Sequence, residues 1–126
     1  MDVSRLLLMA EQARQHAYAP YSGFHVGAAL LTADNRIFTG CNVENSSYGL
    51  TVCAERAAVF NAVSAGKKDF LALAVISDGG GYCRPCGACR QVIREFGRDI
   101  QIIMASKDRQ YEIKKISELL PEEFAF

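Results

Sequence analysis

The chain has 126 residues and a mass of 13.8 kDa, which is the size of one ordinary domain and too short for two well-packed cores. Half of the residues are hydrophobic, 22% are charged, and 14 basic side chains balance 14 acidic ones. This composition argues against an intrinsically disordered chain, and the absence of excess positive charge argues against a nucleic-acid partner. We therefore expect a single domain over residues 1–126.

The beginning of the chain predicts a helix followed by a β-hairpin. Apolar residues recur at helical spacing over residues 2–17, and Pro20 ends that pattern. The apolar-rich stretches 24–31 and 36–41 predict two strands, because a turn-forming pair at 34–35 separates them. A glycine inside each stretch weakens the strand prediction slightly.

From residue 53 onwards, helices alternate with strands. The expected elements are a helix over 53–65, a strand over 71–77, a helix over 86–96, a strand over 100–105, a strand over 111–116 and a helical turn over 117–120. The order α-β-β-α-β-α-β-β contains two strand-to-helix-to-strand crossovers, which favour an α/β sandwich with a mixed sheet.

The five cysteines are an odd number, and the N-terminus alternates apolar with charged residues too early for a signal peptide. Reduced thiols or metal ligands are therefore favoured over a disulfide framework. No apolar run approaches the roughly 18 residues that a membrane-spanning helix needs. We expect a cytoplasmic protein without a membrane partner.

Three of the cysteines fall at the beginnings of predicted helices, namely Cys53, Cys86 and Cys89. Cysteines three residues apart lie on one helix face, so that Cys86 and Cys89 can hold one metal ion, and the helix N-terminus stabilises their thiolates. Zinc with three protein ligands keeps a fourth tetrahedral position for water, as in a catalytic site. Glu55 would then lie beside that water as a proton shuttle.

The spacing of these residues matches the pattern of zinc deaminases, in which a first ligand is followed two residues later by a glutamate and then by P-C-x-x-C. The chain has C-A-E at residues 53–55 and P-C-G-A-C at residues 85–89. Zinc lowers the pKa of bound water from about 15.7 toward about 7, and a nearby carboxylate can move the protons of hydrolysis.

The resemblance extends well beyond this motif. YAPYSGF at 18–24, VGAAL at 26–30, GCNVEN at 40–45, CAER at 53–56 and PCGACRQ at 85–91 closely resemble segments of the small homotetrameric cytidine deaminases. The resemblance implies a three-layer α/β/α sandwich with a mixed β-sheet. It also implies hydrolysis of free cytidine and deoxycytidine to uridine and deoxyuridine with release of ammonia, as in pyrimidine salvage, by a homotetramer.

The resemblance also implies roles for individual residues. Those expected at the metal are the zinc ligands Cys53, Cys86 and Cys89, the general acid/base Glu55, and Arg56, which donates hydrogen bonds to the sulfurs and offsets their charge. Those expected at the substrate are Asn42 and Glu44 on the ribose, Phe24 on the base, backbone groups of Ala54 and Arg84 on the base edge, and Tyr48 and Phe124 near sites shared with neighbouring chains.

Alternatives remain open at this stage. The chain could be a zinc deaminase of nucleoside antibiotics, free bases or nucleotides, although a carboxylate at Glu44 would repel a phosphate. It could be a non-enzymatic module in which Cys83 or Cys41 completes a structural four-cysteine zinc site. Polynucleotide editing is disfavoured by the zero net charge. Phe24 could instead pack in the core.

Four arginines in the C-terminal half also carry expectations. Arg90, Arg94 and Arg98 recur every four residues, a pattern that is typical of a solvated helix face. Arg84 stands before Pro85, where a small hydroxyl residue is common in the family, and this difference could alter access to the base edge.

Overall fold

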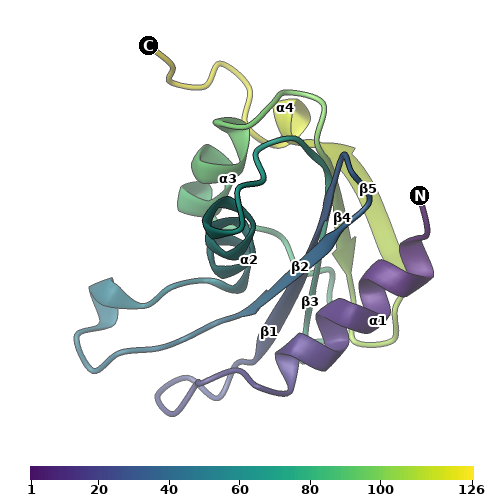
Figure 1. Ribbon diagram of the computed structural model, residues 1–126. Helices are drawn as coiled ribbons and strands as arrows, with labels where there is room; N and C mark the ends of the chain where they lie inside the picture. Colours follow the sequence, from purple (N-terminus) through teal and green to yellow (C-terminus); the bar gives the residue numbers. More distant parts are fainter.

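A five-stranded mixed sheet forms the middle layer of the molecule, and helices cover both of its faces (Figure 1). The computed structural model describes residues 1–126. The elements in chain order are α1 (Val3–Arg14), β1 (Val26–Thr32), β2 (Ile37–Cys41), a 3₁₀-helix (Tyr48–Leu50), α2 (Ala54–Ser64), β3 (Phe70–Ser77), α3 (Gly87–Arg94), β4 (Gln101–Ala105), β5 (Tyr111–Lys115) and α4 (Ile116–Leu119). The predicted three-layer sandwich is confirmed.

The strands lie in the order β2-β1-β3-β4-β5. β3 and β4 are parallel, and the other neighbouring pairs are antiparallel. Because β3 and β4 are parallel, with α3 as the crossover between them, their carboxyl ends lie at the same end of the sheet. The loop that follows β3 returns to this end, where Cys83 N–H donates to the carbonyl of Ala105 at 3.0 Å.

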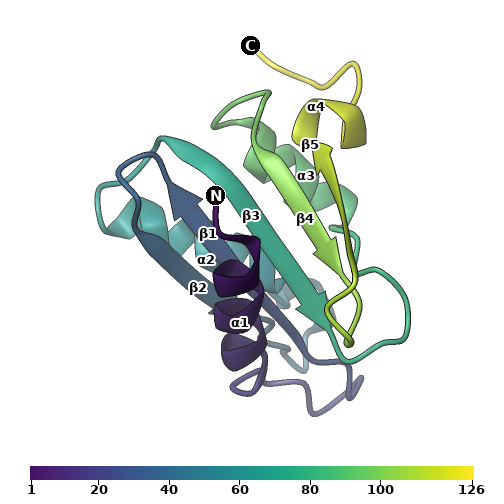
Figure 2. The same ribbon diagram turned by 90° about the vertical axis from the view of Figure 1, so that its right-hand side faces the viewer.

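The two faces of the sheet form two separate apolar layers. α1 packs alone on one face, as the two perpendicular views show (Figure 1 and Figure 2), with Leu6 and Leu7 against Ala29 and Leu31 of β1. The opposite face carries α2, α3 and α4. β1 is buried along its whole length, which explains why its sequence is continuously apolar instead of alternating.

Gly27 and Gly40 allow the helices to approach the sheet closely. A Cβ atom on Gly27 would lie 1.9 Å from the carbonyl oxygen of Ala10 in α1. A Cβ atom on Gly40 would lie 2.4 Å from the backbone nitrogen of Ala58 in α2. The glycines that weaken the strand prediction are therefore the positions at which the layers touch.

Most differences from the sequence prediction lie at element ends. α1 ends at Arg14, before the predicted limit near residue 17, because the chain leaves the helix to pair Tyr18 with Val43. The strand predicted from residue 24 begins at Val26. The 3₁₀-helix at Tyr48 was not predicted, since three residues give no periodicity.

The arginines of α3 hold the C-terminal tail. Arg90 donates to the carbonyls of Pro85 and Leu119, both at 2.8 Å, and Arg94 forms an ion pair with Glu123. Arg98 is largely exposed and lies 3.2 Å from Glu123. The prediction of a solvated stripe is therefore wrong for Arg90 and Arg94, because the carbonyls of Pro85 and Leu119 and the carboxylate of Glu123 replace water.

No helix of the chain combines the length and the apolar character that crossing a membrane requires.

Candidate active site

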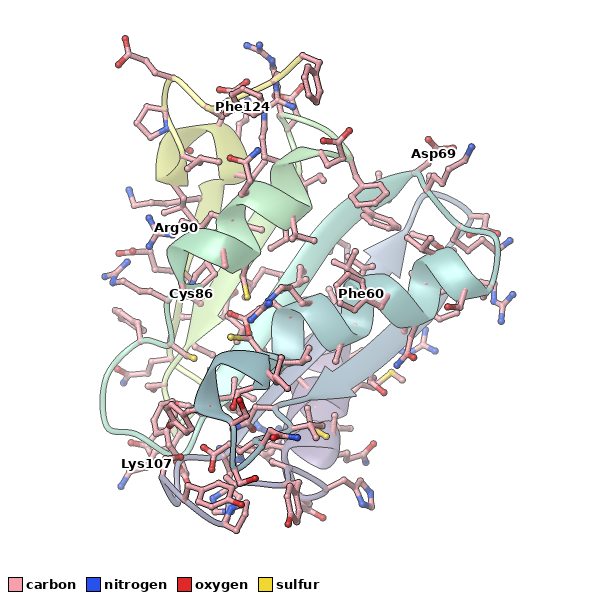
Figure 3. The ribbon with its side chains drawn as sticks, turned by 90° about the vertical axis from the view of Figure 1, so that its left-hand side faces the viewer. Phe60, Asp69, Cys86, Arg90, Lys107 and Phe124 are labelled. Carbon is pink, nitrogen blue, oxygen red and sulfur yellow. The ribbon has the colours of Figure 1, made fainter.

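Two helix N-termini bring the three cysteines together. Cys53 and Cys86 are the N-cap residues of α2 and α3, and both have extended backbone conformations, with ψ values of 154° and 168°. Cys89 is buried in the first turn of α3. Figure 3 shows Cys86 where α3 begins, close to the N-terminal end of α2. Helix N-termini carry unpaired N–H groups and positive potential, which stabilise thiolates.

The sulfur atoms have the spacing of a metal site. All three Sγ atoms lie within 4.8 Å of one another, and the Sγ atoms of Cys53 and Cys86 are 3.8 Å apart. A tetrahedral zinc ion with bonds of about 2.3 Å separates two sulfur ligands by about 3.8 Å. The donor set therefore fits zinc, and three ligands leave the fourth position open.

Cys41 and Cys83 do not join this cluster. Cys41 is half-buried in β2, and Cys83 is buried in the loop before α3. Burial raises the pKa of the Cys83 thiol to about 12, which favours its neutral form. The geometry therefore gives no support to a closed four-cysteine site.

The negative charge of the sulfurs is balanced within the site. Hydrogen bonding from the Cys89 thiol, and then from Arg56, lowers the pKa of Cys53 to about 5, and the proton shared with Cys53 raises the pKa of Cys89. Arg56 Nη2 donates to Cys53 Sγ at 3.4 Å. The guanidinium thus lies against the sulfur it was expected to neutralise.

Glu55 lies beside the cluster and is only 4% exposed. Burial, reinforced by the charge of Cys53, raises the pKa of its carboxyl group to about 7. Residues two apart do not share a helix face, but Cys53 precedes the first helical residue, and both residues line the same cavity. A carboxyl group with a pKa near neutrality can both accept and donate a proton.

A cavity of about 270 Å³ opens next to the sulfurs. Its volume lies close to the lower end of the usual range for small-molecule sites, about 300–1,000 Å³. The predicted site residues that line it are Phe24, Asn42, Glu44, Tyr48, Cys53, Ala54, Glu55 and Cys86. Segments far apart in the sequence therefore form one pocket with a metal-binding end.

Asn42 and Glu44 are buried in the cavity wall, where backbone groups hold their side chains. Asn42 Oδ1 accepts from Val26 N–H at 2.8 Å, and Asn42 Nδ2 donates to the Phe24 carbonyl at 2.7 Å. Glu44 Oε1 accepts from the N–H groups of Tyr21 and Ser22 at 3.0 and 3.1 Å. These bonds fix both side chains before any ligand binds.

Phe24 lies on the cavity wall ahead of β1, and its side chain is 46% exposed. Its ring faces the loop after β3, since a Cβ atom on Gly79 would lie 3.3 Å from ring atom Cε1. The alternative that Phe24 packs in the core is therefore wrong. The ring is available to a flat ligand.

Tyr48, Phe124 and Arg84 differ in their relation to the cavity. Tyr48 is exposed in the 3₁₀-helix at the cavity, whereas Phe124 lies on the tail and does not line the cavity of its own chain. Arg84 lines the cavity, but its Nη1 donates to Glu112 of β5 at 2.8 Å. This ion pair holds the guanidinium against β5.

Ser22 also lines the cavity, although nothing in the sequence predicts a role for it. Its hydroxyl donates to Glu44 Oε2 and accepts from Phe24 N–H at 3.0 Å. The only signal was its position inside the segment 18–24, because a serine before a glycine is ordinary in turns.

The comparisons with known proteins agree with this geometry. Residues 1–105 match the family described as the cytidine and deoxycytidylate deaminase zinc-binding region. The chain belongs to this family. The matched region includes all three clustered cysteines and Glu55, so the zinc site of this deaminase-family chain is the one that the sulfur geometry identifies.

Full-length relatives support the assignment. The chain is 48% identical to a cytidine deaminase of Sporosarcina psychrophila over 126 residues, covering 99% of this chain and 93% of the relative. It is similar to the crystal structure of cytidine deaminase from Burkholderia pseudomallei, with a TM-score of 0.95 and 46% identity over 98% of this chain and 100% of the other. The Mycobacterium tuberculosis enzyme has a TM-score of 0.88 and 45% identity over 100% and 99% of the two chains.

Proposed function

We propose that this protein hydrolyses the 4-amino group of free cytidine and deoxycytidine, giving uridine or deoxyuridine and ammonia. The observation that carries the proposal is the pairing of an open three-cysteine metal site with a buried carboxyl group, Glu55, in one cavity. A structural zinc site is closed by four ligands and has no use for such a carboxyl group.

Each proposed step assigns a task to a residue of this chain. Zinc held by Cys53, Cys86 and Cys89 supplies a Lewis acid that lowers the pKa of water toward about 7. Glu55 takes the proton of the water that attacks C4 of the pyrimidine and passes it to N3. Glu55 then helps to protonate the departing amino group, so that one water is consumed and one ammonia leaves. Backbone groups of Ala54 and Arg84 hold the base edge.

The opposite end of the cavity supports a nucleoside as substrate. Asn42 and Glu44 supply amide and carboxylate groups for sugar hydroxyls, and Phe24 supplies an aromatic face for the base. Hydrogen bonds from Ser22 and Tyr21 lower the pKa of Glu44, so that it is ionised at neutral pH. A negative carboxylate in this position disfavours nucleotides and nucleic-acid strands.

An ultraviolet assay of cytidine loss, with zinc quantified on the same sample, tests the proposal. We expect turnover with about one zinc ion per chain. Cytidine 5′-monophosphate, cytosine and a nucleoside antibiotic are assayed in parallel, and single-stranded oligonucleotides serve as the polymeric comparison. Zinc-replete protein that turns over none of the nucleosides would contradict the assignment.

We also propose a homotetramer in which Tyr48 and Phe124 lie near the sites of neighbouring chains. Support comes from apolar surface on the outer side of α2 and α3, where Val59, Phe60, Val63, Val92 and Phe96 line a shallow depression. Figure 3 shows Phe60 on the outward side of α2 and Phe124 far from Cys86. Apolar patches of this kind mark interaction surfaces on soluble proteins.

The cytoplasm is the proposed location, and one domain over residues 1–126 the proposed organisation. All five cysteines are free, and a three-thiolate metal site needs a reducing compartment. Both apolar layers share the same sheet, which supports one cooperative unit. Cell fractionation with an antibody against the protein tests the first proposal, and a single calorimetric transition of the zinc-bound protein tests the second.

A further inference from the structure

We propose that Ser22 is a positioning residue that holds the Glu44 carboxylate ready for one sugar hydroxyl and ties it to the main chain of Phe24. This inference rests on the proposed nucleoside function and adds a specificity device to the same cavity. Ser22 lies in the turn between α1 and β1, next to Gly23, whose φ of +68° makes the turn tight.

The directions of the Ser22 hydrogen bonds follow from the partners. The Phe24 N–H can only donate, so that Ser22 Oγ accepts from it at 3.0 Å. The ionised carboxylate of Glu44 can only accept, so that the single hydroxyl hydrogen of Ser22 goes to Glu44 Oε2. One hydroxyl group therefore connects the residue proposed for the sugar with the residue proposed for the base.

The Glu44 carboxylate has one hydrogen-bond acceptor site that no residue of the protein uses. A carboxylate offers about four lone-pair sites. Oε1 uses its two sites on the N–H groups of Tyr21 and Ser22, and Oε2 uses one on the Ser22 hydroxyl. One site on Oε2 is left, and it suits one hydroxyl donor.

The same segment is held from its other side. Asn42 Nδ2 donates to the Phe24 carbonyl at 2.7 Å, so that both peptide groups flanking the Phe24 side chain are bonded. Glu44 is itself fixed by the bond from its N–H to the Tyr18 carbonyl at 2.8 Å. Ser22 thus connects two segments that are each already anchored. Loss of its hydroxyl releases only Oε2 of Glu44, because Oε1 keeps its two backbone N–H donors and the fold keeps its own bonds.

Kinetics of Ser22→Ala on cytidine and on 2′,3′-dideoxycytidine test the inference. We expect KM for cytidine to rise about tenfold with kcat within about twofold. Ser22 does not touch the substrate, and the variant weakens substrate binding only because the charged Glu44 loses the hydrogen bond from the Ser22 hydroxyl. KM for the dideoxy substrate should be unchanged, because it lacks the 3′-hydroxyl, the ring hydroxyl that cytidine and deoxycytidine share and that we assign to Glu44. Ser22→Thr, which keeps the hydroxyl, should restore the cytidine KM, and the exposed Ser46→Ala serves as the control.

A double-mutant cycle provides the second test. In a Glu44→Gln background, Ser22→Ala should change KM for cytidine by less than about twofold, because the two residues act through one contact. Equilibrium binding of uridine and 2′,3′-dideoxyuridine gives the same comparison without turnover. Equal losses on both substrates, full additivity in the cycle, or an unchanged KM in Ser22→Ala would each overturn the role of Ser22. If the wild type does not turn over cytidine at all, the proposed function fails instead.

Discussion

Glu55 is the residue on which the proposed chemistry depends most. Its carboxyl group is buried in the cavity wall, and this burial, together with the neighbouring charge of Cys53, raises its pKa to about 7. A buried carboxyl group without an ion-pair partner costs stability, so a structural role alone does not account for it. The location beside the sulfur cluster supports a role in moving protons.

Replacement of Glu55 by glutamine should separate chemistry from structure. Glutamine keeps the size and hydrogen-bonding capacity but cannot take up a proton, so kcat should fall by at least about 10²- to 10⁴-fold. Zinc content and the melting temperature should be retained. Steady-state kinetics and metal analysis on the same preparation measure this, with the exposed Glu122→Gln as control. Near-normal turnover by zinc-replete Glu55→Gln would rule out the mechanism.

The cysteines give a second prediction at the residue scale. Cys86→Ala removes one sulfur of the cluster and should lose both zinc and activity, because two remaining thiolates bind zinc far more weakly. Cys83→Ser should keep zinc at one ion per chain, since Cys83 lies outside the cluster. Atomic absorption of the purified variants measures the metal. Equal zinc loss in both variants would revive the four-cysteine site.

At the scale of elements, the position of α2 and α3 determines the metal geometry. Each helix begins directly after a cysteine, so a small shift of either helix against the sheet changes the distances between sulfurs. Gly40 sets the distance between β2 and α2, because the backbone of Ala54 and Ala58 occupies the space of its missing side chain. The packing of α2 and the metal site are therefore connected.

Gly40→Ala should destabilise the protein and weaken zinc binding together. The added Cβ would lie 2.4 Å from Ala58 N, and overpacking of this kind costs about 1–3 kcal/mol. Urea unfolding and zinc titration measure the two effects. Gly80→Ala is the matched control, because nothing lies within 4 Å of its added Cβ and its φ is not positive. Equal stability of the two variants would contradict the packing argument.

At the scale of the whole molecule, the chain carries an exposed apolar patch on the outer side of α2 and α3, away from α1. Phe60 is 49% exposed there, and the tail bearing Phe124 is held on the same layer by Arg90 and Arg94. A surface of this kind on the layer that supplies the metal ligands would place neighbouring chains close to each cavity. Assembly and activity should then be linked.

Light scattering and activity measurements at decreasing protein concentration test whether activity depends on assembly. We expect the mass of four chains at high concentration and a loss of specific activity on dilution, because Tyr48 and Phe124 would leave the neighbouring sites. Phe60→Lys should give smaller species. Leu8→Lys, which alters a similarly exposed residue on α1, should keep the assembly. A fully active monomer would exclude the proposed arrangement.

The sequence by itself determined the order of the main helices and strands and the placing of cysteines at helix starts, because these depend on short-range features. Helical spacing, apolar runs and turn residues are local, and a cysteine just before a helix lies at its N-terminus whatever the rest of the chain does. Cys53 and Cys86 confirm this, since each is an N-cap. The spacing C-x-E and P-C-x-x-C is equally local.

Only the tertiary structure decided what depends on contacts between distant segments. It showed that Gly27 and Gly40 are points of contact between layers, that Arg90 and Arg94 hold the tail, and that Phe24 faces a cavity. The hydrogen bond from Ser22 to Glu44 joins residues 22 positions apart. Hydrophobic periodicity does not predict such a pair. The partner of a polar side chain depends on which distant segments the fold brings together, and not on its neighbours in the sequence.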